Sequence, residues 1–382
     1  MNTNLAKTHD AFLGLVRLGI GHSNNIDYFD GVDWVRLKAL ADKQGLSAVI
    51  LDALNVDGSN PIPVQMKLEW IGEVLQLYEL RYRQYEKAIS SLSGWYNRHG
   101  FKMMVLKGYA CSIDWPRPEH RPCGDIDIWL FGRQKEADAL LESSEFRVEG
   151  LESVDKVKRI KADASHHHHT VFEWQGFTVE NHYDFVNVHA LKSSAEMEKV
   201  FKKLGTDDSH SVRVIGETVY LPSPNLHALF LVKHMVSHFA AAEISLRHVL
   251  DWAFFVEKHG KDVDWEWLDG MLVKYQMREF VGYINAICID DLGFDSLMFR
   301  DYSVGSGGSV EFKDMKERIL TDILEPVYDS AEPRGTVRRL FYKYERWQGS
   351  AWKQKLCYSE SRWSAFCRGI WAKILKPSSF LA

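Results

Sequence analysis

The first quarter of the chain carries apolar residues at the spacing of an α-helix. Between positions 33 and 41 they recur every three or four residues, which is typical of one helix face. The same spacing returns in 64–99, after Pro61 and Pro63, and predicts one long helix or two joined helices. These residues are Trp34, Leu37, Leu40 and Ala41 in the first segment, and Leu68, Ile71, Val74, Leu75 and Tyr78 in the second. We therefore expect residues 1–95 to be helical.

The pattern then changes to short apolar runs separated by polar stretches. The runs at 103–106, 126–131 and 177–188 predict strands, and 135–143 predicts a helix between the second and the third. A further strand is expected within 216–224, where prolines end it. This part of the chain is therefore expected to contain a sheet.

From residue 224 onward the helical pattern resumes. The Gly/Ser-rich segment 303–309 is predicted to be a connector, because a phosphate-binding loop would follow a clear strand and none precedes it. The chain is accordingly expected to divide into a helical N-terminal region at 1–95, a strand-containing core at 96–223 and a helical C-terminal domain at 224–382.

Composition places the chain among soluble globular proteins. It has 382 residues, of which 46% are hydrophobic and 13% aromatic, enough for two or three domains with cores of their own. The net charge of −5 argues against a strong overall attraction to nucleic acid or to an anionic membrane. The charge is uneven, however, because 334–376 carries eleven basic and two acidic residues, a local net charge of about +9.

The cysteines and the N-terminus favour a cytoplasmic protein. The five cysteines show no CxxC spacing and are odd in number, so thiols in a reducing compartment are expected rather than a disulfide framework. The first residues lack the apolar stretch of a signal peptide, and no apolar run approaches the length of a membrane span. We expect a soluble, cytoplasmic protein without a transmembrane segment; its oligomeric state does not follow from the sequence.

The most informative chemistry lies at the start of the second apolar run, where Gly124 is followed by two aspartates. Strand side chains alternate between faces, so Asp125 and Asp127 point the same way while Ile126 and Ile128 point to the opposite, buried face. Two adjacent carboxylates repel each other, which is tolerable mainly when a cation lies between them. The pair therefore indicates a site for Mg²⁺ or Mn²⁺, and a solvated surface pair is the alternative.

A third acidic ligand is expected on a neighbouring strand. In the run that begins at Phe177, the side chains of Glu180, His182 and Asp184 share one face by the two-residue period. Glu180 is the preferred candidate, with a role in deprotonating a hydroxyl group, and Asp184 is its competitor. The remaining interpretation is that Glu180 only solvates an edge strand.

Basic residues near the acids are candidates for phosphate binding. Lys107 and Gly108 stand at the end of a predicted strand, where a lysine can reach a phosphate and a glycine lets the chain approach closely. The alternative for Lys107 is a solvated side chain. Arg121 lies four residues before Asp125 and is a second candidate, with an ion pair to Glu119 or Asp125 as the alternative.

The histidines give less specific signals. The run at 166–169 either borders a substrate cleft or forms a solvated polar turn, and four adjacent histidines are not expected to ligate one metal together. His234 and His238 share a helix face, but a buried, hydrogen-bonded pair is favoured because the glutamate of the zinc-protease motif is missing. Arg247 and Asp251 are spaced for a partly buried ion pair.

Together these motifs resemble a known family. Leu106-Lys107-Gly108, the segment 121–127 (RPCGDID) and the segment 180–182 (ENH) are similar to the LKG, RPxGDxD and ExH motifs of an uncharacterised bacterial nucleotidyltransferase family. The likeness extends to 33–34, to 246–251 and to the basic-aromatic C-terminus, so it spans most of the chain. The family belongs to the superfamily of DNA polymerase beta, and GDxD is its most specific element here.

The resemblance implies an α+β fold with a mixed-sheet nucleotidyltransferase core between helical regions. It implies that Asp125, Asp127 and Glu180 are catalytic and hold Mg²⁺ or Mn²⁺. An NMP group would pass from an NTP, expected to be ATP, to a hydroxyl or phosphate of a small-molecule acceptor, with release of pyrophosphate. The residues expected to bind the nucleotide are Lys107, Gly108, Arg121, Gly124 and His182. The usual Gly-Ser pair is replaced by Gly108-Tyr109, so Lys107 is expected to take over that phosphate contact.

Other functions stay open at this point. One is a non-catalytic protein that binds a nucleotide or a nucleic acid, and another is an enzyme that adenylylates a partner protein. Nucleic acid is the less favoured partner. The basic tail contains Trp347, Trp352, Trp363 and Trp371, which would stack bases, lie on an acidic membrane surface or pack within the molecule; packing is favoured.

Overall fold

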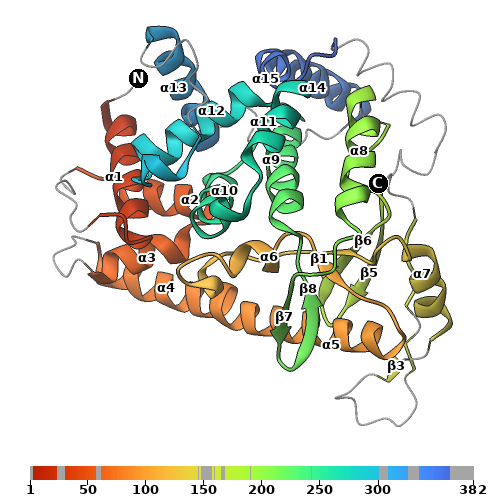
Figure 1. Ribbon diagram of the computed structural model, residues 1–382. Coiled ribbons are helices and arrows are strands. Elements are labelled where there is room, and N and C mark those ends of the chain that lie inside the picture. The colour runs from red at the N-terminus through yellow and green to blue at the C-terminus, as the bar shows by residue number, and fades with distance from the viewer. Residues whose placement is uncertain are drawn as a thin grey trace. The chain divides into compact units, whose positions relative to one another are not determined.

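The computed structural model of the protein is made up mainly of helices, together with strands that gather in one region (Figure 1). The larger sheet has six strands. Of the described residues, 64% are helical, and these helices are combined with a mixed sheet, so the predicted α+β fold class is confirmed. The structure describes residues 3–23, 31–56, 62–144, 146–147, 157–158, 160–164, 168–189, 191–241, 243–300, 309–325 and 335–361.

The N-terminal helices are α1 (Thr3–Gly19), α2 (Trp34–Gln44) and α3 (Ser47–Val56). Helix α2 begins where Asp33 accepts hydrogen bonds from the backbone N–H groups of Val35 and Arg36, which stabilises the first turn. It ends at Gly45, whose φ of 69° lies in the left-handed region that glycine adopts without strain. The predicted apolar stripe of this helix is confirmed, since Leu37, Leu40 and Ala41 are buried and Trp34 is half-buried.

A nearly continuous helical run follows, from α4 (Val64–Val74) through the π-helical turn η1 (Leu75–Leu80) to α5 (Arg81–Arg98). This confirms the prediction of one long helix or two joined helices. The buried face of this run, however, was predicted only in part. The buried residues of α4 and η1 are Trp70, Val74 and Tyr78, whereas Leu68, Ile71 and Leu75 are exposed.

The sheet has the strand order β5-β6-β2-β1-β8-β7. Its strands are β1 (Met104–Val105), β2 (Ile126–Trp129), β5 (His169–Trp174), β6 (Phe177–His182), β7 (Ser211–Val214) and β8 (Glu217–Tyr220). The pairs β2·β6 and β1·β8 are parallel, and β1·β2, β5·β6 and β7·β8 are antiparallel. A separate two-stranded sheet is formed by β3 (Phe146–Arg147) and β4 (Val157–Lys158).

All four strands expected from the sequence are present, with shorter bounds. The run 177–188 becomes a strand only to His182, because Tyr183 and Asp184 both donate their backbone N–H to the carbonyl oxygen of His168 and leave the ladder. The strand within 216–224 ends before two prolines, and helix α9 starts at Pro224, a favoured first helical residue. Strands β5 and β7 were not predicted.

The other helices are short to medium in length. They are α6 (Tyr109–Ser112), α7 (Gln134–Ser143), α8 (Lys192–Leu204), α9 (Pro224–Ala241), α10 (Leu246–His259), α11 (Trp265–Lys274), α12 (Arg278–Ala286), α13 (Val310–Leu324), α14 (Thr336–Gly349) and α15 (Ala351–Cys357), with the single turns η2 (Pro118–His120), η3 (Gly260–Asp262), η4 (Ile287–Asp291) and η5 (Ser296–Met298). The predicted helix at 135–143 is α7. The predicted connector at 303–309 lies, apart from Ser309, outside the described residues, as do Trp363 and Trp371.

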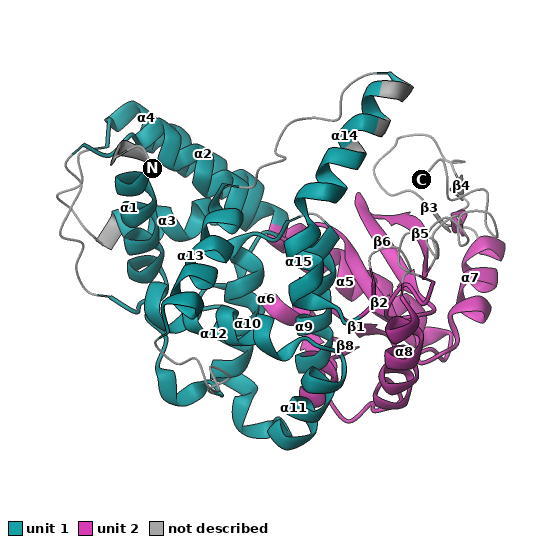
Figure 2. Cartoon of the chain, turned by 90° about the horizontal axis from the view of Figure 1, so that it is seen from above, with its two compact units in different colours: residues 1–81, 112–122, 228–359 teal, residues 82–111, 123–227, 360–382 magenta. Residues whose placement is uncertain are grey.

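The chain forms two compact units (Figure 2). One comprises 1–81, 112–122 and 228–359 and is helical; the other comprises 82–111, 123–227 and 360–382 and contains the six-stranded sheet. The three-part division expected from the sequence stays a prediction.

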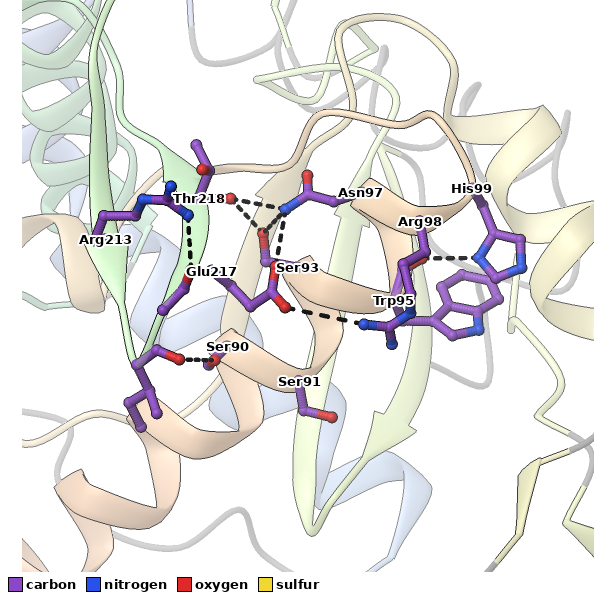
Figure 3. A network of polar contacts seen from close by, with 12 residues as sticks. Ser90, Ser91, Ser93, Trp95, Asn97, Arg98, His99, Arg213, Glu217 and Thr218 are labelled. Atoms are coloured by element: carbon purple, nitrogen blue, oxygen red, sulfur yellow. Dashed lines mark hydrogen bonds and ion pairs between the residues drawn. The ribbon is translucent and has the colours of Figure 1, made fainter.

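In the sheet unit, helix α5 lies against the β7–β8 hairpin through a network of polar contacts (Figure 3). The hydroxyl of Ser93 donates to the carbonyl oxygen of Thr218 at 2.6 Å, and the side-chain amide of Asn97 donates to the same oxygen at 3.2 Å. Between them Gly94 faces Glu217, whose carboxylate a Cβ atom at this position would overlap. The side chains of α5 therefore hold the hairpin by hydrogen bonds, and Gly94 allows the two elements to pack closely.

Helices α7 and α8 hold the central strands by buried polar contacts. In α7, Asp138 accepts hydrogen bonds from Asn181 and Thr170, both at 2.8 Å. In α8, Glu198 accepts the backbone N–H of Phe185 at 3.1 Å and that of Val186 at 3.0 Å. Glu198 thus satisfies the donors that are left when β6 ends, and it fixes the chain immediately after the strand.

Two further findings concern expectations from composition. The described cysteines, Cys111, Cys123, Cys288 and Cys357, are buried and are not joined in disulfide bonds. Among the helices of the described residues, none combines the length and the apolar character that crossing a membrane requires.

Candidate functional site

The parallel pairing of β2 with β6 places two predicted acids side by side. Asp127 and Glu180 are direct register partners, and partners in a parallel ladder project to the same face of the sheet. The neighbours Ile126 and Ile128 are fully buried, as predicted from their alternation. Two residues that lie 53 positions apart in the sequence thus share one small area at the sheet surface.

Asp127 is the most deeply buried acid of this group, and it is ion-paired. Its Oδ1 atom lies 3.0 Å from Nζ of Lys107 and 3.1 Å from Nε2 of His182. Burial favours the neutral acid, but the charge of Lys107 and the hydrogen bond from His182 outweigh it and hold the pKa of this carboxyl far below its ordinary value. Asp127 is therefore a carboxylate at neutral pH.

His182 links the acids to the backbone. Its Nδ1 atom lies 3.1 Å from the carbonyl oxygen of Asp184, and its Nε2 atom lies 3.6 Å from Oε2 of Glu180 as well as close to Asp127. Burial lowers the pKa of His182, but its hydrogen bonds to Asp127 and Glu180 raise it further, to about 9. His182 was predicted as a nucleotide-binding residue; the structure places it against the two acids.

Lys107 is the cation of the group. Its side chain is 28% exposed, so it is reachable from solvent while its amino group contacts Asp127. Burial lowers its pKa, but Asp127 and then Glu180 raise it above the ordinary value, with a smaller contribution from Asp125. Lys107 is therefore positively charged and lies near acids of both β2 and β6.

Gly108 lets the chain approach Tyr85 closely. Its φ of 65° is left-handed, and a Cβ atom there would overlap the hydroxyl group of Tyr85. That hydroxyl donates to the backbone carbonyl oxygen of Asp125 at 2.9 Å. Gly108 and Tyr85 together fix the backbone just before β2. A Cβ atom on Gly124 would meet nothing within 4 Å, so space is open beside the strand entry.

The two aspartates of the motif differ in their surroundings. Asp127 is 2% exposed and lies within β2, whereas Asp125 is exposed and lies just before the strand. Ligand atoms of Asp127, Glu180 and His182 lie within 4.8 Å of one another, and Asp125 is not in that group. The competitor of Glu180, Asp184, lies beyond the end of β6 and pairs with Lys202 of α8.

Arg121 corrects one sequence-based interpretation. Its guanidinium group forms a bidentate pair with Asp251, with N–O distances of 2.7 and 2.8 Å, and the side chain is buried. The bidentate partner is thus neither Glu119 nor Asp125, and the predicted phosphate contact of Arg121 stays a prediction. Arg247 donates to the carbonyl oxygen of Pro122 at 3.4 Å, and its charge, after that of Arg121, helps to lower the pKa of Asp251.

The histidine run contains two residues that the structure describes, His168 and His169. His169 is buried and begins strand β5, where it is the register partner of His182. Its Nε2 atom lies 3.8 Å from Oε1 of Glu180. The interpretation as a solvated turn is therefore wrong for His169, and the interpretation that the run borders a substrate cleft stays a prediction. A sequence signal existed: Gln175-Gly176, both with positive φ, is a two-residue hairpin turn between alternating runs.

The histidine pair of helix α9, in contrast, is less buried than expected. His234 is half-buried and His238 is exposed, with ring centroids 4.4 Å apart. Together with His248 they form a ring cluster, and burial, with the nearby charge of Arg247, lowers the pKa of His248 to about 3. The backbone N–H of Ser245 donates to Nδ1 of His248 at 3.1 Å, so this histidine caps helix α10.

Comparison with known proteins agrees with this arrangement. The model of a family described as uncharacterised nucleotidyltransferase matches residues 30–290. The chain belongs to this family. The match covers more than half of the chain and includes every residue of the acidic group. No curated protein and no solved structure matches the chain.

Proposed function

We propose that the protein transfers an NMP group from an NTP, with ATP as the expected donor, to a hydroxyl or phosphate of a small-molecule acceptor. The observation that carries this proposal is the side-by-side placement of Asp127 and Glu180 beside Lys107, in a chain of a nucleotidyltransferase family. Asp125 at the entry to β2 completes the acidic set. The placement supplies charge of both signs within one small area of the sheet, where Lys107 is 28% exposed.

The donor set fits a divalent cation that prefers oxygen ligands. Mg²⁺ and Mn²⁺ are held by a few carboxylates together with phosphate oxygens, and Asp127 is ionised even though it is buried. A cationic group already lies at Asp127, namely the ammonium of Lys107 at 3.0 Å. Asp125, Asp127 and Glu180 would hold the cation, which supplies polarisation of the phosphoryl oxygens and a lower pKa of an attacking hydroxyl.

The chain's own residues have distinct roles in this proposal. Lys107 binds phosphate oxygens and offsets the charge of the triphosphate. Glu180, which is half-buried, accepts the proton of the acceptor hydroxyl. His182 keeps the carboxylate of Asp127 oriented through its hydrogen bond, and Gly108 keeps the backbone close enough for Tyr85 to hold Asp125. The hydroxyl oxygen then attacks the α-phosphorus and pyrophosphate leaves.

Transfer from ATP labelled on its α-phosphate tests the proposal. The purified protein is incubated with labelled ATP, Mg²⁺ and either a pool of small hydroxyl compounds or a cell lysate. Label on small molecules together with pyrophosphate release supports it. Label on protein identifies a protein-adenylylating enzyme, and nucleotide binding without transfer identifies a non-catalytic binding protein; either result overturns the assignment of a small-molecule acceptor.

A matched pair of variants controls this experiment. Asp127→Asn removes one charge at the proposed site and keeps the shape of the side chain. Glu173→Gln removes one charge on β5 of the same sheet, where the exposed carboxylate accepts a hydrogen bond from Thr178 at 3.3 Å. Transfer lost in the first variant and kept in the second ties the activity to Asp127 and not to the net charge of the sheet.

A further inference from the structure

Three histidine rings meet beside the acidic group, at one end of β5 and β6. His168 immediately precedes β5, His169 is its first residue, and His182 is the last residue of β6. The ring centroids are 4.4 Å apart for His168 and His169, 5.4 Å for His168 and His182, and 5.2 Å for His169 and His182. We call these three residues the histidine cluster.

Each ring contributes one nitrogen atom to a small group of potential ligand atoms. The three nitrogen atoms lie within 4.8 Å of one another. Zinc–nitrogen bonds of about 2.0–2.1 Å in a tetrahedron bring such atoms to roughly 3.3 Å, so a modest contraction suffices. Adjacent strand residues normally face opposite ways, but His168 lies outside the ladder of β5, which lets its ring turn toward His169 and His182.

The backbone fixes this end of the hairpin. The carbonyl oxygen of His168 accepts the backbone N–H groups of Tyr183 at 3.0 Å and Asp184 at 3.1 Å. The Nδ1 atom of His182 in turn lies 3.1 Å from the carbonyl oxygen of Asp184. A hydrogen bond from one ring nitrogen to a backbone carbonyl is the usual support of a metal-binding histidine, because it fixes the orientation of the ring. The proton that Nε2 of His182 donates to Asp127 would leave when an ion binds.

The chemistry of the donors selects the kind of ion. Imidazole nitrogen suits Zn²⁺, Co²⁺, Ni²⁺ and Cu²⁺, whereas Mg²⁺ prefers oxygen. Glu180 lies at the border of the cluster, with its carboxylate oxygens 3.8 Å from Nε2 of His169 and 3.6 Å from Nε2 of His182. It is placed to supply a fourth ligand or to hold a water molecule in that position.

We infer that His168, His169 and His182 form a binding site for a zinc-class ion, separate in ligand type from the oxygen site of the carboxylates. The inference goes beyond the proposed transfer reaction and does not depend on it. Since Nε2 of His182 also contacts Asp127 at 3.1 Å, this nitrogen has to give up that hydrogen bond when it ligates an ion. Zinc at the cluster would therefore release one oxygen of Asp127 toward the neighbouring site.

Direct metal binding to the untagged full-length protein tests the inference. After removal of metals, the protein is titrated with Zn²⁺ against a chromogenic chelator, and separately with Co²⁺, whose visible absorption reports tetrahedral nitrogen ligation. We expect one ion per chain. Absence of binding by the folded protein, or a Co²⁺ spectrum of an octahedral oxygen site, would overturn the inference.

Variants separate the cluster from the histidine run as such. His182→Ala lies on a different strand from the run, and we expect it to lower Zn²⁺ affinity by about 100-fold or more, since loss of even a supporting partner costs about 10–100-fold. The double variant His166→Ala/His167→Ala keeps the cluster intact and should bind as the wild type does. The opposite pattern would show that the run alone holds the ion and would contradict the site.

Two further variants keep the result interpretable. His169→Gln removes a second proposed ligand with a smaller change of volume, so weaker binding by both His169→Gln and a folded His182→Ala supports the site. Unchanged binding by His169→Gln contradicts it. Asp125→Asn should leave Zn²⁺ binding unchanged while it weakens nucleotide binding, so a failure of the transfer reaction is distinguishable from a failure of the zinc site.

Discussion

Each of the two units contains a buried aspartate paired with a cation, and the two pairs differ in how completely they are satisfied. In the helical unit, Asp251 is 5% exposed and accepts two hydrogen bonds from Arg121 and a third from the indole N–H of Trp115 at 2.9 Å. In the sheet unit, Asp127 is 2% exposed and shares the ammonium of Lys107 with other acids. Both carboxyl groups have lowered pKa values.

The difference lies in the cation. The guanidinium of Arg121 is itself buried, and its planar fork matches one carboxylate, so the pair leaves little room for a ligand. The ammonium of Lys107 is a point charge, 28% exposed, and it faces an excess of negative charge. In the pair of Arg121 with Asp251, the carboxylate and the guanidinium satisfy each other, and we call such a pair saturated. In the pair of Lys107 with Asp127, the partly exposed ammonium is outnumbered by acids, so both charges can still bind a ligand. Sequence motifs alone assigned Arg121 and Lys107 the same role.

The largest expected effect is on the stability of the helical unit. Arg121→Met leaves the carboxylate of Asp251 buried without its main partner, and we expect a loss of about 3–5 kcal/mol in the free energy of unfolding. Chemical denaturation followed by tryptophan fluorescence measures it. The double variant Arg121→Met/Asp251→Leu removes both charges and should recover most of the loss; a double variant as unstable as the single one would refute the assignment of a saturated pair.

The next largest effect is on chemistry in the sheet unit. Asp127→Asn should reduce the rate of nucleotidyl transfer by about 10²–10³-fold, because a carboxylate that holds a catalytic cation contributes several kcal/mol to transition-state stabilisation. Single-turnover transfer from labelled ATP measures the rate, with Glu173→Gln as the control. Equal rates in Asp127→Asn and the control would contradict the difference drawn between the two aspartates, since Asp127 would then serve stability only, as Asp251 does.

A smaller effect sharpens the role of the turn beside Lys107. Gly108→Ala and Gly132→Ala both place alanine at a positive φ, 65° and 83°, but only the Cβ atom at 108 meets a neighbour, the hydroxyl of Tyr85. We expect Gly108→Ala to cost about 1–3 kcal/mol more than Gly132→Ala, the usual cost of overpacking. Thermal unfolding compares them.

The hydroxyl group of Tyr85 provides the check on that explanation. Removing it in Gly108→Ala/Tyr85→Phe should recover part of the additional loss, because the overlapping atom is gone. If the double variant is less stable than Gly108→Ala, the close approach is not the reason for glycine at this position.

The smallest effects are opposite slopes of stability against pH. The folded pKa of His182 is raised to about 9, above the ordinary value of 6.5, so its contribution is complete below pH 6.5 and is lost as the pH rises toward 9. The folded pKa of His248 is lowered to about 3, so its contribution is complete above pH 6.5 and is lost as the pH falls toward 3. Each unit thus contains one histidine with a shifted pKa, and the two shifts have opposite directions.

Urea midpoints measured from pH 4 to pH 9 test these slopes. His182→Asn should flatten the alkaline side and His248→Asn the acid side, each without affecting the other side. A flattening of the same side by both variants would contradict the assigned directions.

Much of the acidic group follows from local sequence. The two-residue period predicts that Ile126 and Ile128 face away from Asp127, and the apolar runs predict β2 and β6 themselves. That both strands contribute an acid to one site was an expectation, and their parallel register is consistent with it. These features depend only on alternation along a strand and on neighbouring apolar residues, which are local properties.

The misses have two causes. The partner of Arg121 lies 130 residues away, and nothing in the local spacing distinguishes Asp251 from the nearer acid Glu119. The strand β5 was missed because its first residue, His169, belongs to a polar run, although the turn at Gln175-Gly176 is a local signal of the hairpin with β6. Only the first of these positions depends on contacts that a window of a few residues does not encode.

The most direct test of the central claim is calorimetric titration of ATP, CTP, GTP and UTP in the presence of Mg²⁺ or Mn²⁺. The account predicts metal-dependent binding of at least one of these nucleotides to the wild type and to Glu173→Gln, and its loss in Asp127→Asn. No binding by the folded wild type in either metal, or equal binding by Asp127→Asn, would contradict the claim that the acids beside Lys107 form a nucleotide site.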